Sequence, residues 1–255
     1  MRPAILDVPN MTLEGTDLDV ISYSLYVHKP GVHKIGSKPP AAYIGGMVEN
    51  AKLAKEFYPG WVVHCYLSDE LLHVQPVLED LGVQVTPYDN SPFWQGLFTR
   101  LIVMDDPRVR RFCQRDTDSR LGSLDQAAVA AWIKSGKKWH AMRGCKSHGV
   151  PLLGCAWGGP GQSFPNIRRA IAKWMKTDYV KGSDQRFTAR LVWPEAQKSC
   201  LQHDAAFGNR FGKTYPFPKP ATPYPYKFLF QTVAPYKESW EGLAVVGHGE
   251  KGKYV

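Results

Sequence analysis

Long apolar runs are missing from this sequence of 255 residues, and no stretch approaches the roughly 18 consecutive apolar residues of a membrane-spanning helix. The first residues, Met1-Arg-Pro-Ala-Ile-Leu-Asp, also lack the basic-then-apolar layout of a secretory signal peptide. Cysteine is scarce: there are five, and no Cys-x-x-Cys pair, which argues against a disulfide framework or a zinc knuckle. These absences predict a protein without a membrane span, with reduced thiols, located in the cytoplasm of whatever cell makes it.

Acidic residues are also few, 23 against 32 lysines and arginines, which gives a formal net charge of +9. Basic residues cluster at 108–111, 137–138, 168–176 and 251–253. A basic surface attracts polyanions, so nucleic acid or an anionic glycan is one partner that this charge favours. Solubility together with a phosphate-bearing small substrate is the other interpretation, and composition does not choose between them.

Strand and helix patterns alternate along the first half of the chain. Apolar, β-rich runs predict strands at 19–27, 61–67, 83–85, 109–114 and 139–142. Periodic or capped segments predict helices at 41–58, 68–81, 93–105 and 124–135. This alternation is typical of parallel βαβ units, so we expect an α/β fold with a mostly parallel sheet flanked by helices. We expect a single domain over 1–255, with a core at about 18–215 and a loop-rich C-terminal cover at 216–255.

Two carboxylates, Asp116 and Asp118, directly follow the strand predicted at 109–114. In open α/β sheets, ligands bind at the carboxyl ends of the strands. Two carboxylates this close repel each other unless a cation or hydrogen-bond donors neutralise them. Their oxygens suit Mg²⁺ or Mn²⁺, whose coordination shell substrate phosphates can complete. Taken alone, the Asp-x-Asp pattern is also that of a solvated acidic loop.

The surrounding run, Phe112-Cys-Gln-Arg-Asp-Thr-Asp-Ser-Arg-Leu121, resembles the Arg-Asp-x-Asp-Ser-Arg signature of a group of bacterial and phage glycosyltransferase-like proteins of GT-A type. The similarity continues in order from about residue 20 to 220, for example at Phe98-Thr-Arg-Leu101 and Gly182-Ser-Asp-Gln185. It implies a GT-A-like, Rossmann-type sheet, a nucleotide-sugar donor and a Mn²⁺ or Mg²⁺ ion. The chain departs from the family at Met142-Arg-Gly-Cys145, where Met-Arg-Asp-His is usual. Either Lys146 and His148 compensate for the missing side chains, or the acceptor differs from that of the family.

Two further roles follow from this resemblance. His203 corresponds to a late histidine that completes the metal shell, with a neutral imidazole nitrogen as ligand, and Asp204 could orient it. Asp184 is placed near the sugar, where a carboxylate either deprotonates the acceptor hydroxyl or stabilises a cationic sugar. A core or surface histidine and a helix cap are the competing interpretations of these residues.

The donor nucleotide is expected at the end of the first strand. Ser24 and Tyr26 would contact its base and ribose, and Arg100 and Arg115 would balance the charge of its diphosphate. Packing inside the sheet is the competing interpretation for a serine or tyrosine in a strand.

A glycine-rich stretch at 154–161 has an aromatic residue at its centre. Gly154 would let backbone amides approach a sugar or phosphate, and Trp157 would stack on a sugar face. A sharp turn explains the same glycines.

The sequence therefore predicts a metal-dependent glycosyltransferase that moves a hexosyl or pentosyl group from a nucleotide-diphosphate donor to an acceptor hydroxyl. The acceptor would be a hydroxymethylated base in phage DNA or a glycan precursor. Two alternatives stay open: a non-catalytic nucleic-acid-binding protein, and a metal-dependent nucleotidyltransferase or phosphohydrolase.

Overall fold

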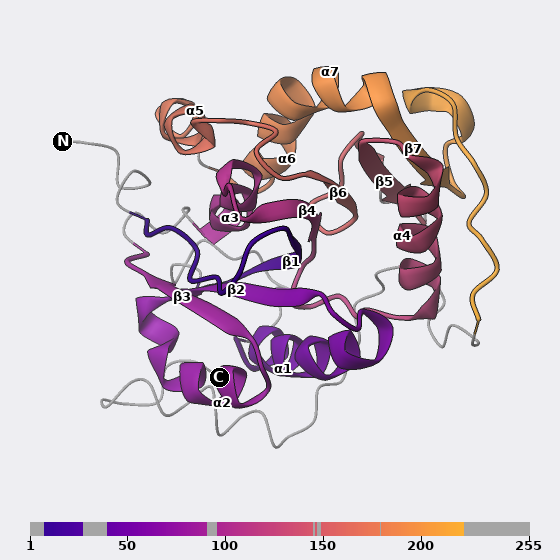
Figure 1. The fold of residues 1–255 in the computed structure, drawn as a ribbon. Coiled ribbons are helices and arrows are strands. Elements are labelled where there is room, and N and C mark those ends of the chain that lie inside the picture. The colour runs from indigo at the N-terminus through magenta and orange to yellow at the C-terminus, as the bar shows by residue number, and fades with distance from the viewer. Residues whose placement is uncertain are drawn as a thin grey trace.

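The structure is a computed structural model that describes residues 8–27, 40–90, 96–144, 146, 149–178 and 180–221. A seven-stranded sheet runs through the described chain in the order β3-β2-β1-β4-β6-β5-β7 (Figure 1). The strands are β1 (Leu18–Leu25), β2 (Val62–Ser68), β3 (Gln84–Tyr88), β4 (Val109–Gln114), β5 (Trp139–Arg143), β6 (Trp157–Pro160) and β7 (Cys200–Asp204). The α-helices are α1 (Pro40–Phe57), α2 (Gln75–Asp80), α3 (Gly96–Thr99), α4 (Ser123–Ser135), α5 (Ile167–Trp174), α6 (Ser183–Phe187) and α7 (Trp193–Ala196).

The sheet reverses its direction of growth between β1 and β4. The first three strands pair in parallel and extend one way from β1, and the chain then returns to add β4 in parallel on the other side of β1. Beyond β4, β6 runs antiparallel to both of its neighbours, and β7 is parallel to β5. In open α/β sheets, ligands bind beside such a reversal, at the carboxyl ends of the strands. The carboxyl ends of β1 and β4, called the crevice below, are therefore where a ligand site is expected.

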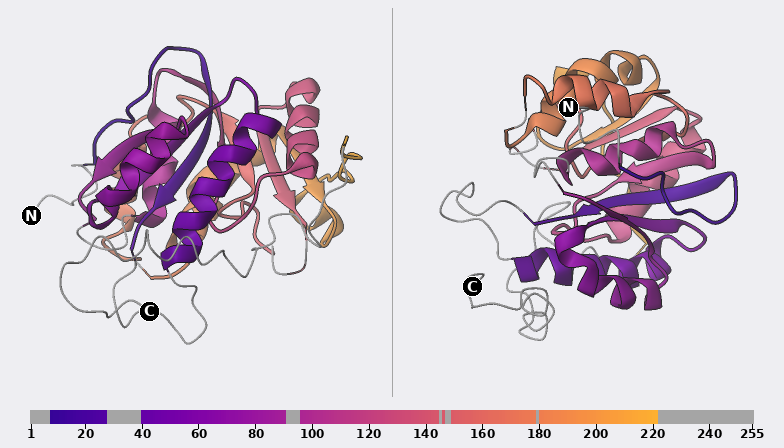
Figure 2. Two further views of the ribbon diagram at one scale, coloured as in Figure 1. Left: turned by 90° about the horizontal axis from the view of Figure 1, so that it is seen from below. Right: turned by 90° about the vertical axis from the view of Figure 1, so that its left-hand side faces the viewer.

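Helices cover both faces of the sheet (Figure 2). Helices α1, α2 and α4 pack on one face, and α3, α5 and α6 pack on the other. Because side chains alternate along a strand, Val20 of β1 joins one core and Ile21 joins the other. The predicted α/β architecture, with a mostly parallel, Rossmann-like sheet flanked by helices, is confirmed.

The glycine-rich stretch forms a strand where the sequence pattern indicated a loop. A Cβ atom on Gly158 would lie 2.4 Å from the carbonyl oxygen of Phe112, and one on Gly159 would lie 2.3 Å from the ring of Trp139. Both distances are far shorter than any real carbon contact, so these glycines exist to let β6 pack tightly. They do not form a ligand-binding turn.

The end of the predicted core is tied to the last strand. The backbone of Tyr215 pairs with β7, donating to the carbonyl of Gln202 at 2.8 Å and accepting from the amide of Asp204 at 3.2 Å. Residues 222–255 of the cover lie outside the described residues. Among the described helices, none is long and apolar enough to cross a membrane.

Candidate functional site

The acidic loop (residues 115–121) leaves the end of β4 and is fixed by helix α1. The buried amide of Asn50 donates to the carbonyl oxygens of Thr117 at 3.3 Å and Ser119 at 2.7 Å, and it accepts from the amide of Leu121 at 3.0 Å. Three bonds from one side chain bind three successive parts of the loop. The backbone that carries both carboxylates is therefore preorganised by α1.

Two other residues tie the same loop to α1. A Cβ atom on Gly46 would lie 2.0 Å from the carbonyl oxygen of Thr117, so the helix approaches the loop as closely as a glycine allows. Arg120 is buried, pairs with Glu49 of α1 and donates to that same carbonyl at 3.2 Å. Arg120 therefore has a structural role.

Arg100 joins two carboxylates that are far apart in the sequence. Its Nη1 contacts Oδ1 of Asp116, and its Nη2 lies 2.9 Å from Oδ2 of Asp184. The arginine belongs to a 3₁₀ turn after α3 (Arg100–Asp105), while Asp116 follows β4 and Asp184 begins α6. Burial alone would lower the pKa of Arg100, but Asp116 and Asp184 outweigh it and raise the pKa above its usual value. Arg100 is thus a permanent cation at the crevice.

Two tyrosines, Tyr43 and Tyr26, lie close to the ion pairs that Arg100 forms with Asp116 and Asp184. Burial, followed by the charges of Asp118 and Asp116, raises the pKa of the Tyr43 phenol to about 12. Burial raises the pKa of Tyr26 as well, with Arg100 acting in the opposite direction. A Cβ atom on Gly96 would lie 2.1 Å from the Tyr26 ring, so this ring rests directly on the backbone of α3. Tyr26 is placed at the crevice as predicted, and Tyr43 is a neighbour that sequence reasoning missed.

The start of the glycine-rich stretch reaches the site from the other side. A Cβ atom on Gly154 would lie 3.0 Å from Nη2 of Arg100 and 3.5 Å from Oδ2 of Asp184. The thiol of Cys155 is buried, and burial, with a smaller contribution from Asp116, raises its pKa. The backbone at 154–155 therefore borders the cluster formed by Arg100, Asp116 and Asp184.

Arg115 is turned away from this cluster, which corrects its expected role at a diphosphate. Its Nη2 lies 3.0 Å from Oδ1 of Asp125, and both side chains are 1% exposed or less. The hydroxyl of Tyr58 also donates to Asp125. This buried network holds β4 to α1 and α4, so Arg115 has no surface with which to meet a ligand.

Ser24 and Trp157 also have structural roles in place of the ligand-binding roles predicted for them. The hydroxyl of Ser24 accepts from the backbone amide of Arg100 at 2.9 Å and lies 2.6 Å from the hydroxyl of Thr99, so Ser24 positions the turn that carries Arg100. Trp157 is fully buried, with ring centroids 5.4 Å from Phe112 and 6.2 Å from Trp139. A ring enclosed in this way packs the core and cannot stack on a sugar.

His203 lies away from the acidic loop. Its strand, β7, is three positions from β4 in the sheet, or about 14 Å at the usual strand spacing. Its Nδ1 is 2.9 Å from Nε2 of His140, its ring stacks on Phe217, and burial lowers its pKa to about 4. Asp204 accepts from Arg143 at 2.6 Å and does not orient His203. The expectation that His203 completes the shell of a metal at Asp116 is therefore wrong.

Without His203, the acidic loop still offers two carboxylates to a divalent cation. Among the described residues, no group of three or more His, Cys, Asp or Glu side chains is arranged to hold a metal ion. Asp116 and Asp118 still fit Mg²⁺ or Mn²⁺, because such ions often take one or two carboxylates and fill their remaining positions with water and substrate phosphates. Cys145 and His148, from the segment that departs from the family pattern, lie outside the described residues.

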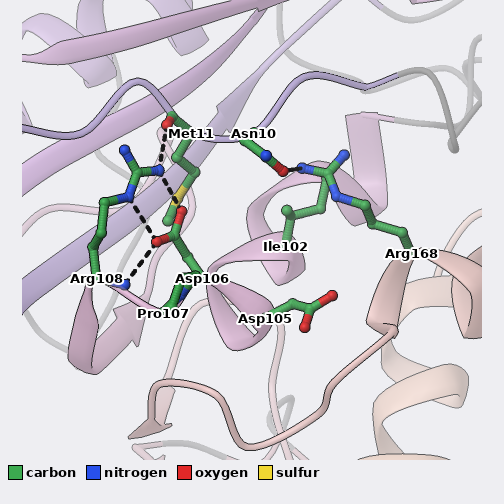
Figure 3. Close-up of a pocket in the computed structure, with 8 residues that line it drawn as sticks. All are labelled: Asn10, Met11, Ile102, Asp105, Asp106, Pro107, Arg108 and Arg168. Atoms are coloured by element: carbon green, nitrogen blue, oxygen red, sulfur yellow. Dashed lines mark hydrogen bonds and ion pairs between the residues drawn. The ribbon is translucent and has the colours of Figure 1, made fainter.

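A cavity of about 370 Å³ lies at the opposite end of β4 (Figure 3). Arg108 on its wall donates to the carbonyl oxygens of Met11 at 2.6 Å and Leu13 at 2.9 Å. Arg168 on the facing wall donates to Oδ1 of Asn10 at 3.1 Å. Both arginines hold the N-terminal segment 8–14 across the sheet edge, so this cavity has a structural explanation and is separate from the carboxylates.

No family model and no curated protein matches the sequence of the chain. Among solved structures, the fold is similar to that of 4-diphosphocytidyl-2C-methyl-D-erythritol synthase from Anaerococcus prevotii, with a TM-score of 0.43, 9% identity, and 91% of this chain and 96% of that chain covered. It is also similar to Rv0371c from Mycobacterium tuberculosis, with a TM-score of 0.45, 11% identity, and 76% and 90% of the two chains covered. A manganese complex of that protein gives a TM-score of 0.42 and 10% identity. At these values the similarity concerns the path of the chain and assigns no chemistry.

Proposed function

We propose that this protein is a metal-dependent glycosyltransferase of GT-A type, which moves a sugar from a nucleotide-diphosphate donor to an acceptor hydroxyl. The observation that carries the proposal is the meeting of Asp116, Arg100 and Asp184 at the reversal point between β1 and β4. Both signs of charge that such a transfer requires, anionic ligands for a metal and a cation for a diphosphate, come together where an α/β sheet binds its ligand.

Asp116 and Asp118 would hold the Mn²⁺ or Mg²⁺ ion. When bound, the ion supplies positive charge to the diphosphate that leaves the sugar. The chain contributes the rigidity of this arrangement, because Asn50 and Gly46 of α1 fix the loop from behind. Arg100 contributes a second, permanent positive charge beside the same group.

Asp184 is the residue proposed to act on the reacting sugar or the acceptor. It is 6% exposed and its Oδ2 is tied to Arg100, which leaves Oδ1 to accept a proton from the acceptor hydroxyl or to face a cationic sugar. Tyr26, at the end of β1, would contact the base or ribose of the donor.

The net charge of +9 favours an anionic acceptor, and a hydroxymethylated base in phage DNA would provide one. An enzyme acting on that base would have to extrude it from the duplex or take it from a single strand. A glycan precursor is the other acceptor class.

Metal-dependent nucleotidyl transfer or phosphate-ester hydrolysis is a second candidate function. Such sites usually need more than two carboxylates, and the contact of Arg100 with both Asp116 and Asp184 brings a third carboxylate into the cluster. Nucleotidyl transfer would release pyrophosphate from a nucleoside triphosphate, and hydrolysis would release phosphate, whereas glycosyl transfer would release a nucleoside diphosphate from a nucleotide sugar.

A product assay distinguishes these functions. The purified full chain would be incubated with UDP-, GDP- and ADP-sugars or with nucleoside triphosphates, with Mn²⁺, in the presence of glucosylatable DNA or a glycan extract. Release of nucleoside diphosphate that Asp116→Asn lowers about 100-fold or more supports glycosyl transfer. Asp17→Asn is the matched control, since Asp17 is exposed and precedes β1. Pyrophosphate release from a triphosphate would favour the second candidate, and metal-independent, salt-sensitive DNA binding without turnover would favour a non-catalytic protein.

A further inference from the structure

The guanidinium of Arg100 occupies the position beside Asp116 that a metal ion would take. Nη1 of Arg100 contacts Oδ1 of Asp116, one of the carboxylates proposed to hold the metal. A guanidinium and a divalent cation on the same carboxylate repel each other, since like charges a few ångströms apart repel even in a polar surrounding. The metal and Arg100 therefore compete for Asp116.

Arg100 has other partners that it would keep if it left Asp116. Nη2 is 2.9 Å from Oδ2 of Asp184, and Nη1 also donates to the backbone carbonyl of Arg115 at 3.3 Å. A buried charge that loses its only partner is strongly destabilised, and this arrangement avoids that cost. The Asp184 contact is thus an anchor around which the guanidinium can exchange its second partner.

The two carboxylates that Arg100 contacts differ in their exposure to solvent, and the more exposed one is the proposed metal ligand. The side chain of Asp116 is 35% exposed, whereas those of Arg100 and Asp184 are 9% and 8% exposed. A dissolved cation therefore reaches Asp116 more readily than Asp184. At the buried end, residue 154 is a glycine, and any side chain there would begin 3.0 Å from Nη2 of Arg100. The backbone at Gly154 therefore packs closely against the nitrogen that Asp184 holds, which keeps this end of the guanidinium in place.

We propose that Arg100 is an exchangeable counter-ion: it neutralises Asp116 in the free protein, yields Asp116 when a divalent cation binds, and then offers the freed N–H groups to the donor diphosphate while Asp184 holds it. This inference rests on the proposed function. It implies that Arg100 weakens metal binding in the absence of donor. It also implies that a diphosphate strengthens metal binding, because the diphosphate gives Arg100 a new anionic partner, and such coupling is reciprocal.

The test is a titration of the free, full-length protein with Mn²⁺ alone, with unbound Mn²⁺ followed by electron paramagnetic resonance. Arg100→Gln removes the competing charge and should tighten Mn²⁺ binding about tenfold or more. Arg110→Gln is the matched control. Arg110 lies near the start of β4 and pairs with Asp19 of β1, at the other end of these strands from Asp116. Its loss lowers the net charge equally and should leave Mn²⁺ affinity unchanged.

Asp184→Asn is an independent variant, and it should change the Mn²⁺ affinity in the opposite direction to Arg100→Gln. Without Asp184, Asp116 becomes the remaining carboxylate of Arg100, so Mn²⁺ binding should weaken, and this weakening should be largely absent when Arg100→Gln is also present. If Arg100→Gln fails to fold, Asp184→Asn still tests the exchange, because unchanged or tighter Mn²⁺ binding overturns it.

The failure of this inference differs from the failure of the proposed function. If Asp118→Asn abolishes Mn²⁺ binding but Arg100→Gln leaves it unchanged or weaker, the metal site stands and the exchange of Arg100 is overturned. If the wild-type protein binds Mn²⁺ no better than the Asp116→Asn/Asp118→Asn variant, the metal site, the proposed function and the exchange all fall together.

Discussion

Replacement of Asn50 removes the side chain that fixes the acidic loop against α1. In Asn50→Ala, the carbonyl of Ser119 loses a donor at 2.7 Å and the amide of Leu121 loses an acceptor at 3.0 Å. The carbonyl of Thr117 keeps the Nη1 donor of Arg120 at 3.2 Å, so the loss falls mainly on the other two groups. A buried group deprived of its hydrogen bond costs about 1–3 kcal/mol. The free energy of unfolding should fall by about 2–4 kcal/mol, and the Tm by roughly 5–15 °C.

Asn50→Asp has nearly the same shape but a different dependence on pH. It replaces the donor NH₂ with an acceptor that faces the carbonyl oxygens of Thr117 and Ser119. Burial and these oxygens raise the pKa of the introduced carboxyl above its unfolded value of about 3.9. The folded state therefore holds the proton more tightly than the unfolded state, so this variant is most stable at low pH and loses stability as pH rises through the folded pKa. At neutral pH it should be less stable than Asn50→Ala.

Guanidinium unfolding of the three proteins between about pH 5 and pH 8 checks both statements. The difference between wild type and Asn50→Asp should widen as pH rises, while the difference between wild type and Asn50→Ala stays nearly constant. If Asn50→Asp matched the wild type at pH 8, or if its deficit did not change with pH, Asn50 would not be the donor to two carbonyls that the structure shows.

Three further substitutions test the corrected residues. Arg115→Met breaks a buried ion pair and should lower the free energy of unfolding in denaturant by about 3–5 kcal/mol. The double variant Arg115→Met/Asp125→Leu should lose less, and equal losses in the two variants would contradict the pairing. The pKa of His203 is lowered to about 4 in the folded state, against about 6.5 unfolded, so its protonation favours unfolding and stability is lost as pH falls between these values. In thermal melts, His203→Gln should flatten this slope, and an unaltered slope would show that another group is responsible. Trp157→Phe should lower stability but leave calorimetric affinity for a nucleoside diphosphate or nucleotide sugar unchanged, whereas a large loss of affinity would restore the sugar-stacking role.

The sequence was informative where local pattern determines the structure. The strand predicted at 109–114 has the bounds of β4, and the charged residues that follow it are a local signal of its end. From that strand the position of Asp116 and Asp118 at the crevice followed directly. The helix predicted at 68–81 is instead a 3₁₀ turn followed by the short α2, and the helix predicted at 93–105 contains α3 and a 3₁₀ turn, with 93–95 outside the described residues.

Side-chain direction and distant pairing were beyond local pattern. Arg115 adjoins Asp116 in the sequence, yet it turns to Asp125, and it is Arg100, 15 residues earlier, that reaches the carboxylate. Nothing within a window around either arginine shows which of them a partner on another element will attract. Likewise, the position of His203 depends on the pairing of β7 with β5 at the sheet edge, a contact between segments about 60 residues apart. Tyr43 could have been found only by noting that the helix after β1 must face the same crevice.

Calorimetric titration with UDP and GDP, with and without Mn²⁺, tests the central claim most directly. It would be carried out on the wild-type protein and on the Asp116→Asn/Asp118→Asn variant, whose fold is first verified by its thermal melt. The account predicts binding of at least one nucleoside diphosphate that requires Mn²⁺ and is lost in the double variant. Binding that is independent of metal and unchanged in the double variant would contradict it, because the acidic loop at the end of β4 would then have no part in holding the ligand.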